Sequence, residues 1–120
     1  MKETAIAFLT LAAAGNTAEA FGRYVATDFR HHNPYFKSDA ASLGDAMREN
    51  ALQHPSRSFE VQRALQDGDL VAVHSRVSFG AKPMVIAVVH IFRVSGGKIA
   101  ELWDIGQPVP DESPNAAGMF

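Results

Sequence analysis

Apolar residues recur at helical spacing in the first half of the chain, and this pattern predicts three helices. Strong helix formers occupy residues 2–14, and the pair Gly15-Asn16 that follows is a natural C-terminal cap. Thr17 can cap a second helix over residues 17–25, where bulky apolar side chains return every three or four positions. A third helix is predicted over residues 39–52, because apolar residues stand four apart there.

The spacing of apolar residues changes in the second half of the chain. Some segments there alternate apolar and polar residues, and others are almost continuously apolar. Such patterns are typical of strands that are buried on one or both faces. Glycine-containing turn signals separate the segments at Asp67-Gly68 and Gly96-Gly97, and Lys82-Pro83 should also break the chain. The four predicted strands are 59–65, 70–79, 84–94 and 99–109.

Three helices followed by four meandering strands indicate an α+β fold, with the helices packed on one face of an antiparallel sheet. Long strands that are joined by tight hairpins curl as they twist. We therefore expect a cone-shaped, curved antiparallel sheet whose N-terminal helices close a pocket. The length of 120 residues fits a single domain over residues 1–120.

Composition excludes several classes of function. The chain has no cysteine, which rules out disulfides, thiolate catalysis and a cysteine-based zinc site. Its net charge is −2 and no segment concentrates Lys or Arg, so we expect neither a nucleic acid nor a membrane as partner. An apolar run at 5–14 imitates a signal peptide, but Glu3 and Thr10 do not suit one, and we expect a cytoplasmic protein.

His90 and Asp104 are polar residues within apolar strand segments, on either side of the Gly96-Gly97 turn. A polar group in an apolar wall costs free energy unless it is paired or faces a pocket. A loop with an odd number of residues, such as the three-residue type with a glycine bulge, would place both on one sheet face. Such a pair can pass a proton between two substrate atoms near neutral pH. The alternative is a pair that only hydrogen-bonds within the core.

Three further histidines have two interpretations each. His31 and His32 have aromatic neighbours and could form the wall of an aromatic pocket, but surface or capping positions are the alternative. His74 lies on the more polar face of its strand, where it could equally face solvent. No pair of histidines has the spacing of a helical metal motif, so we expect no metal. No glycine-rich phosphate loop is present, so we expect no nucleotide or other cofactor.

Four segments, taken in order, resemble the SnoaL-like polyketide cyclase family: His32-Asn33-Pro34, 67–75, 88–94 and 97–104. That family is part of the nuclear-transport-factor-two-like superfamily, which also contains ketosteroid isomerase. Residues 107–110 and the terminal Met119-Phe120 are similar to those of a bacterial subgroup of predicted SnoaL-like aldol-condensation enzymes. Members of that subgroup commonly have Asp at the position of His90, so this chain departs from the subgroup there.

The resemblance implies a cone-shaped α+β barrel, usually a homodimer, whose pocket opens inside the cone. In the polyketide cyclases a His and an Asp on the last hairpin are the acid/base pair for an intramolecular aldol closure. These roles would fall on His90 and Asp104, with the same separation of 14 residues. The superfamily also contains many members without a demonstrated activity, so the fold alone does not establish a function.

The leading hypothesis is therefore a cofactor-independent acid/base enzyme that acts next to a carbonyl group of a small apolar molecule, by aldol-type cyclisation or isomerisation. Asp104 would remove a proton from carbon, and His90 or His32 would support the enolate oxygen. The alternatives are a ligand-binding protein without turnover and a structural dimer whose pocket is filled. The residues expected to bind substrate are Tyr24, Tyr35, Met47, His74, Phe92 and Leu102.

The outer face of the predicted sheet indicates a homodimer. On the last hairpin this face carries a large apolar stripe, and no helix remains in the sequence to cover it. Monomers rarely expose so wide an apolar patch. The residues of the stripe are Val89, Ile91, Trp103 and Ile105.

Overall fold

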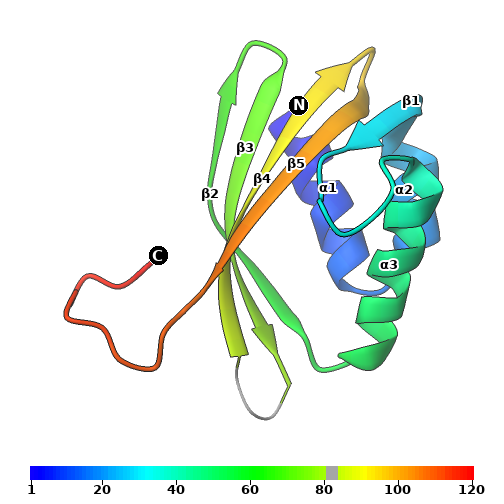
Figure 1. The fold of residues 1–120 in the computed structure, drawn as a ribbon. Helices are drawn as coiled ribbons and strands as arrows, with labels where there is room; N and C mark the ends of the chain where they lie inside the picture. The colour runs from blue at the N-terminus through cyan, green and yellow to red at the C-terminus, as the bar shows by residue number, and fades with distance from the viewer. Residues whose placement is uncertain (81–83) are drawn as a thin grey trace.

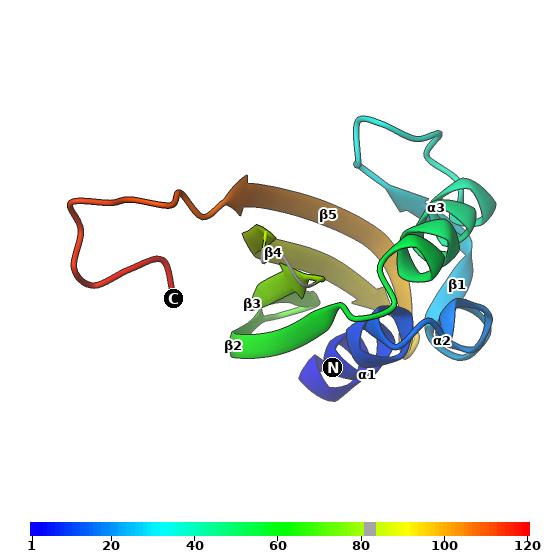
Figure 2. The same ribbon diagram turned by 90° about the horizontal axis from the view of Figure 1, so that it is seen from below.

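The computed structural model describes residues 1–80 and 84–120, and it shows three helices on the concave side of a curved five-stranded sheet (Figures 1 and 2). The α+β fold predicted from the sequence is confirmed. The predicted break at Lys82-Pro83 lies outside the described residues. The elements are α1 (Lys2–Ala13), α2 (Thr17–Tyr24), β1 (Val25–His31), α3 (Ala40–Gln53), β2 (Ser58–Asp67), β3 (Leu70–Phe79), β4 (Met84–Ser95) and β5 (Lys98–Pro108).

The three helices begin and end close to the predicted positions, because their caps are encoded locally. Gly15 takes a φ of +88° just after α1, a conformation that glycine adopts without the steric cost of a side chain. Asp39 precedes α3 and accepts hydrogen bonds from the Ser42 backbone N–H at 2.9 Å and from the Ser42 hydroxyl at 2.7 Å. A carboxylate in this position satisfies one of the unpaired N–H groups at a helix start.

The sheet has the order β1-β5-β4-β3-β2, and the expectation of four antiparallel strands was wrong in one respect. β1 pairs with β5 in parallel, which makes the sheet mixed. β1 was not predicted because no turn signal separates it from α2 and because buried and exposed residues alternate over only a few of its positions. Phe29 and His31 are buried, whereas Asp28 and Arg30 are exposed. The sheet is also open rather than closed into a barrel, since β1 and β2 are its two edges.

The register of the β4–β5 hairpin places His90 directly opposite Asp104, so the prediction that the two share a face is confirmed. The reason differs from the predicted one. The turn has two residues, Gly96 and Gly97, both at positive φ, as a type I′ turn requires. A bulge at Ala100 then shifts the register by one residue beyond Val94 and restores the predicted pairing.

The hydrophobic core lies between α1, α2 and the inner face of the sheet. Phe8 of α1 is fully buried and meets Phe21 and Phe92 edge-on, at ring-centre distances of 5.3 and 5.9 Å. Edge-to-face packing of aromatic rings adds to the free energy gained by burial. The fully buried side chains Val71, Val73 and Ile99 complete this part of the core. No helix in the described part of the chain is long and apolar enough to cross a membrane.

Candidate active site

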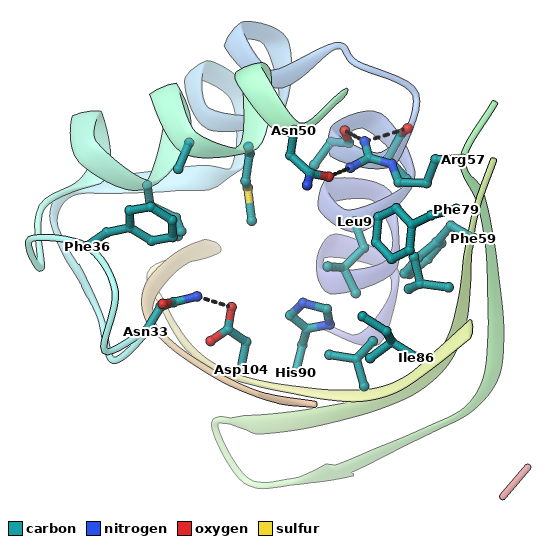
Figure 3. Close-up of a pocket in the computed structure, with 17 residues that line it drawn as sticks. Leu9, Asn33, Phe36, Asn50, Arg57, Phe59, Phe79, Ile86, His90 and Asp104 are labelled. Atoms are coloured by element: carbon teal, nitrogen blue, oxygen red, sulfur yellow. Dashed lines mark hydrogen bonds between the residues drawn. The ribbon is translucent and has the colours of Figure 1, made fainter. Parts of the chain in front are cut away.

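A cavity of about 400 Å³ lies between the concave face of the sheet and the helices α1 and α3 (Figure 3). Most of its wall is apolar, with Leu9 from α1, Met47 from α3 and Ile86 from β4 as examples. The polar side chains in the wall are few, and they come from both ends of the cavity: Asn33, Asn50, Arg57, His90 and Asp104. An apolar cavity with a few placed polar groups is typical of a small-molecule site.

His90 and Asp104 lie side by side in this wall, as neighbours on β4 and β5. No hydrogen bond between them is present among those of the described residues. The Asp104 carboxylate instead accepts a hydrogen bond at 3.1 Å from the side-chain amide of Asn33. The interpretation of a pair that only hydrogen-bonds within the core therefore does not match the geometry, since both side chains reach the cavity.

Asn33 is held in a fixed orientation by the loop that follows β1. Its side-chain oxygen accepts from the Tyr35 backbone N–H at 3.0 Å, so its amide nitrogen is the atom that faces Asp104. The Asn33 backbone N–H donates to Nδ1 of the buried His31 at 3.1 Å. Because Nδ1 is an acceptor, the proton of neutral His31 lies on Nε2, which donates to the Lys37 carbonyl at 2.5 Å. This network positions the carboxylate of Asp104.

His90 is half-buried among apolar side chains of the cavity wall, and its protonation state follows from that setting. Burial lowers the pKa of His90 from 6.5 to about 4, and the Asp104 carboxylate opposes only part of this effect. The imidazole is therefore neutral near pH 7. Its Nδ1 atom is buried and has no hydrogen-bond partner among the described residues. A buried polar atom without a partner costs free energy.

Three of the predicted site residues line the cavity: Asp104, His90 and Met47. His32 does not, which corrects the expectation that it shares the pocket. β1 ends at His31, which points inward, and the next residue, His32, points outward and stacks on Trp103 with ring centres 4.9 Å apart. There His32 Nε2 also lies 2.6 Å from a carboxylate oxygen of Glu101.

The other predicted substrate-binding residues also lie outside the cavity wall. Phe92 and Leu102 are fully buried in the core behind it. Tyr24 packs at the edge of the core, under the guanidinium of Arg23, and Tyr35 is 86% exposed. His74 is on the outer face of the sheet, where it hydrogen-bonds Arg63 and stacks on Phe120, the last residue of the chain.

The sequence reasoning missed three polar residues of the wall, namely Asn33, Asn50 and Arg57. Asn33 had a signal, because an Asn before Pro34 is typical of a turn in which the Asn side chain bonds the backbone two residues on. Asn50 and Arg57 had none, since each is an ordinary polar residue near the end of a helix. Within residues 1–80 and 84–120, no three His, Asp or Glu side chains gather in a group that could hold a metal ion.

Comparison with known proteins places the fold in a family. A sequence profile described as the SnoaL-like domain matches residues 5–102, which end two positions before Asp104. No curated protein matches the chain significantly.

Solved structures share the fold at low identity. IdmH of Streptomyces antibioticus, named as a candidate polyketide cyclase, is 21% identical, with 88% of this chain and 90% of IdmH covered and a TM-score of 0.73. A candidate polyketide cyclase of Bacillus cereus is 20% identical; the match covers 87% of this chain and 72% of the cyclase, with a TM-score of 0.77. AclR of Streptomyces galilaeus, named as a candidate hydroxylase, is 21% identical; the match covers 89% of this chain and 90% of AclR, with a TM-score of 0.70. Because the sequence profile of the SnoaL-like domain matches most of this chain, the chain belongs to the family of SnoaL-like domains.

Proposed function

We propose that the chain is a cofactor-independent acid/base enzyme that acts next to a carbonyl group of a small, largely apolar molecule. The observation that carries this proposal is the juxtaposition of Asp104 and neutral His90, paired across β4 and β5, in the wall of one apolar cavity. Family membership supports a cyclase or isomerase type of reaction. The cavity volume of about 400 Å³ is within the range of small-molecule sites.

Asp104 is the proposed base. Its carboxylate takes a proton from the carbon next to the substrate carbonyl, and the electron pair of that C–H bond moves onto the carbonyl oxygen to give an enolate. The proton then returns to carbon at another position in an isomerisation. In an aldol closure the enolate carbon instead attacks a second carbonyl of the same molecule, and the resulting alkoxide takes up the proton. The hydrogen bond from Asn33 keeps the carboxylate in place during either course.

His90 is the proposed hydrogen-bond donor to the enolate oxygen. A neutral imidazole has one N–H donor and carries no positive charge. A donor that is already positioned in an apolar, water-poor site stabilises the developing negative charge more than it would in water. His90 therefore acts as a hydrogen-bond donor rather than as an imidazolium acid, because its pKa of about 4 keeps it deprotonated at neutral pH.

A ligand-binding protein of the same fold is the alternative, since an apolar cavity with a few polar groups also suits binding without turnover. A structural dimer with a vestigial pocket would require protein side chains to fill the cavity. The volume of about 400 Å³ between the sheet and the helices speaks against that requirement.

Replacement of Asp104 by asparagine distinguishes an acid/base enzyme from a ligand-binding protein. We expect Asp104→Asn to abolish deuterium exchange at the carbon next to the carbonyl, when small β-dicarbonyl compounds and cyclic ketones are screened by NMR. The asparagine oxygen can still accept the hydrogen bond from Asn33, so the fold should persist, but an amide cannot take up the proton. Asp45→Asn, an equivalent change on the exposed surface of α3, should leave exchange unchanged.

Exchange at the wild-type rate in Asp104→Asn would place the base elsewhere. Binding of these compounds without exchange in the wild-type chain would favour the ligand-binding alternative.

The low pKa of His90 predicts how stability depends on pH. Unfolded chains bind a proton at His90 below pH 6.5, whereas folded chains bind it only near pH 4, so stability is lost as the pH falls between these values. The loss should reach about 2 kcal/mol between pH 7 and pH 5. Urea unfolding at these two pH values should show this loss in the wild-type chain and much less in His90→Gln. An equal loss in both chains would contradict a neutral His90 in the folded chain.

We further propose that two copies pair through the outer face of the sheet. The stripe of Val89, Ile91, Trp103 and Ile105 is covered by no helix of the described chain, and Ile105 is 67% exposed. Phe120 reaches this face at β3, where it stacks on His74. Burial of such a stripe in a symmetric dimer would remove a large apolar area from water.

Light scattering after size exclusion tests the dimer. The wild-type chain should have about twice the monomer mass of 13.0 kDa, and Ile105→Glu should dissociate it because a buried carboxylate without a partner is costly. Leu52→Glu is the matched control, since Leu52 is 76% exposed on α3, away from the sheet. A wild-type monomer at micromolar concentration would overturn this proposal.

A further inference from the structure

Arg57 lies at the opposite end of the cavity from Asp104, in the connection between α3 and β2 (Figure 3). Its guanidinium donates to the carbonyls of Ala12 and Ala13, at 3.0 and 2.8 Å, and so caps the C-terminal end of α1. It also donates to the side-chain oxygen of Asn50 on α3, at 2.5 Å. The side chain is therefore held rigidly by two helices while it lines the cavity.

These bonds leave part of the guanidinium available. Arg57 has five N–H donors, and the three bonds to Asn50, Ala12 and Ala13 occupy three of them. The remaining two have no acceptor among residues 1–80 and 84–120. The three groups that accept hydrogen bonds from Arg57 are all neutral. Among the described residues of the cavity wall, the one carboxylate belongs to Asp104, at the opposite end of the cavity. Burial also lowers the pKa of Arg57 below its ordinary value, as expected for a charge that no carboxylate compensates.

We propose that Arg57 and Asn50 form a subsite for a carboxylate of the ligand, so that the molecule bound in this cavity is an oxo acid. Its carbonyl end would lie at His90 and Asp104, its carboxylate at Arg57, and its hydrocarbon part against the apolar wall between them. The assignment of the carbonyl end rests on the proposed function, but the carboxylate subsite does not. A guanidinium is the side chain best suited to a carboxylate, and hydrogen bonds between ionised groups are about twice as strong as neutral ones.

A purely structural role for Arg57 would explain its bonds to α1, so removal of Arg57 itself is a poor test. Asn50→Asp is a sharper change. The new carboxylate keeps the oxygen that accepts from Arg57, and it therefore preserves the link between α1 and α3. At the same time it neutralises the guanidinium and repels a second carboxylate. Gln53→Glu is the matched control, because it adds the same charge three residues further along α3 at an exposed position.

The probes are cyclohexanones that carry a carboxylate on zero to four methylene groups, each compared with its own methyl ester. Dissociation constants are measured by calorimetry at low salt. For at least one chain length, the wild-type chain should bind the acid about tenfold or more tightly than the ester, as a charge-assisted hydrogen bond predicts. Asn50→Asp should reduce this ratio to about one, and Gln53→Glu should retain it.

The subsite is overturned if no acid binds, if acids bind no better than esters at every chain length, or if the preference survives in Asn50→Asp. Failure of the proposed function gives a different result. The wild-type chain would then bind acids more tightly than their esters, and Asn50→Asp would lose this preference. The wild-type chain would, however, catalyse no deuterium exchange in any of the acids.

Discussion

The register of the β4–β5 hairpin is the constraint from which the candidate site follows. In the register of the turn alone, His90 would lie opposite Trp103, and Asp104 would point to the outer face. The bulge at Ala100 shifts the pairing by one residue, and Asp104 then shares the inner face with His90. A shift of one residue turns every later side chain of β5 to the other side of the sheet. The same bulge therefore buries Leu102 and places Trp103 outside.

A second interaction holds the edge of the sheet to this hairpin. Glu101 is buried on the outer face and accepts from Arg30 of β1 at 3.3 Å and from Arg93 of β4 at 3.1 Å, and His32 lies 2.6 Å away. The hydrogen bond from His32, helped by Arg93 and Arg30, lowers the pKa of Glu101 from 4.5 to about 2 although burial acts in the opposite direction. The cluster fixes the end of β1, and the loop that begins there carries Asn33 to Asp104. The inner site thus depends on an ionic cluster of the outer face.

The sequence was informative where a pattern is local. The glycine turns and the spacing of apolar residues follow from neighbouring positions, and they were sufficient to predict the helices and four strands. The shared face of His90 and Asp104 was predicted from a longer loop, whereas the structure produces it by the bulge at Ala100. β1 and His32 were different, because their positions depend on pairing with β5, about 70 residues away along the chain. Arg57 illustrates the same limit, since its role follows from the carbonyls at the end of α1, which no local pattern connects to it.

The central claim is that a ligand of this cavity meets a neutral His90 beside Asp104. Nitrogen-15 NMR of the imidazole tests it directly, with the chain labelled at histidine and titrated with phenols as mimics of an enolate. Our account predicts that His90 shows the nitrogen shifts of a neutral imidazole at pH 7 and that bound phenol moves them by formation of a hydrogen bond. A phenol that binds while the His90 signals stay unchanged, or a His90 that is protonated at pH 7, would contradict it.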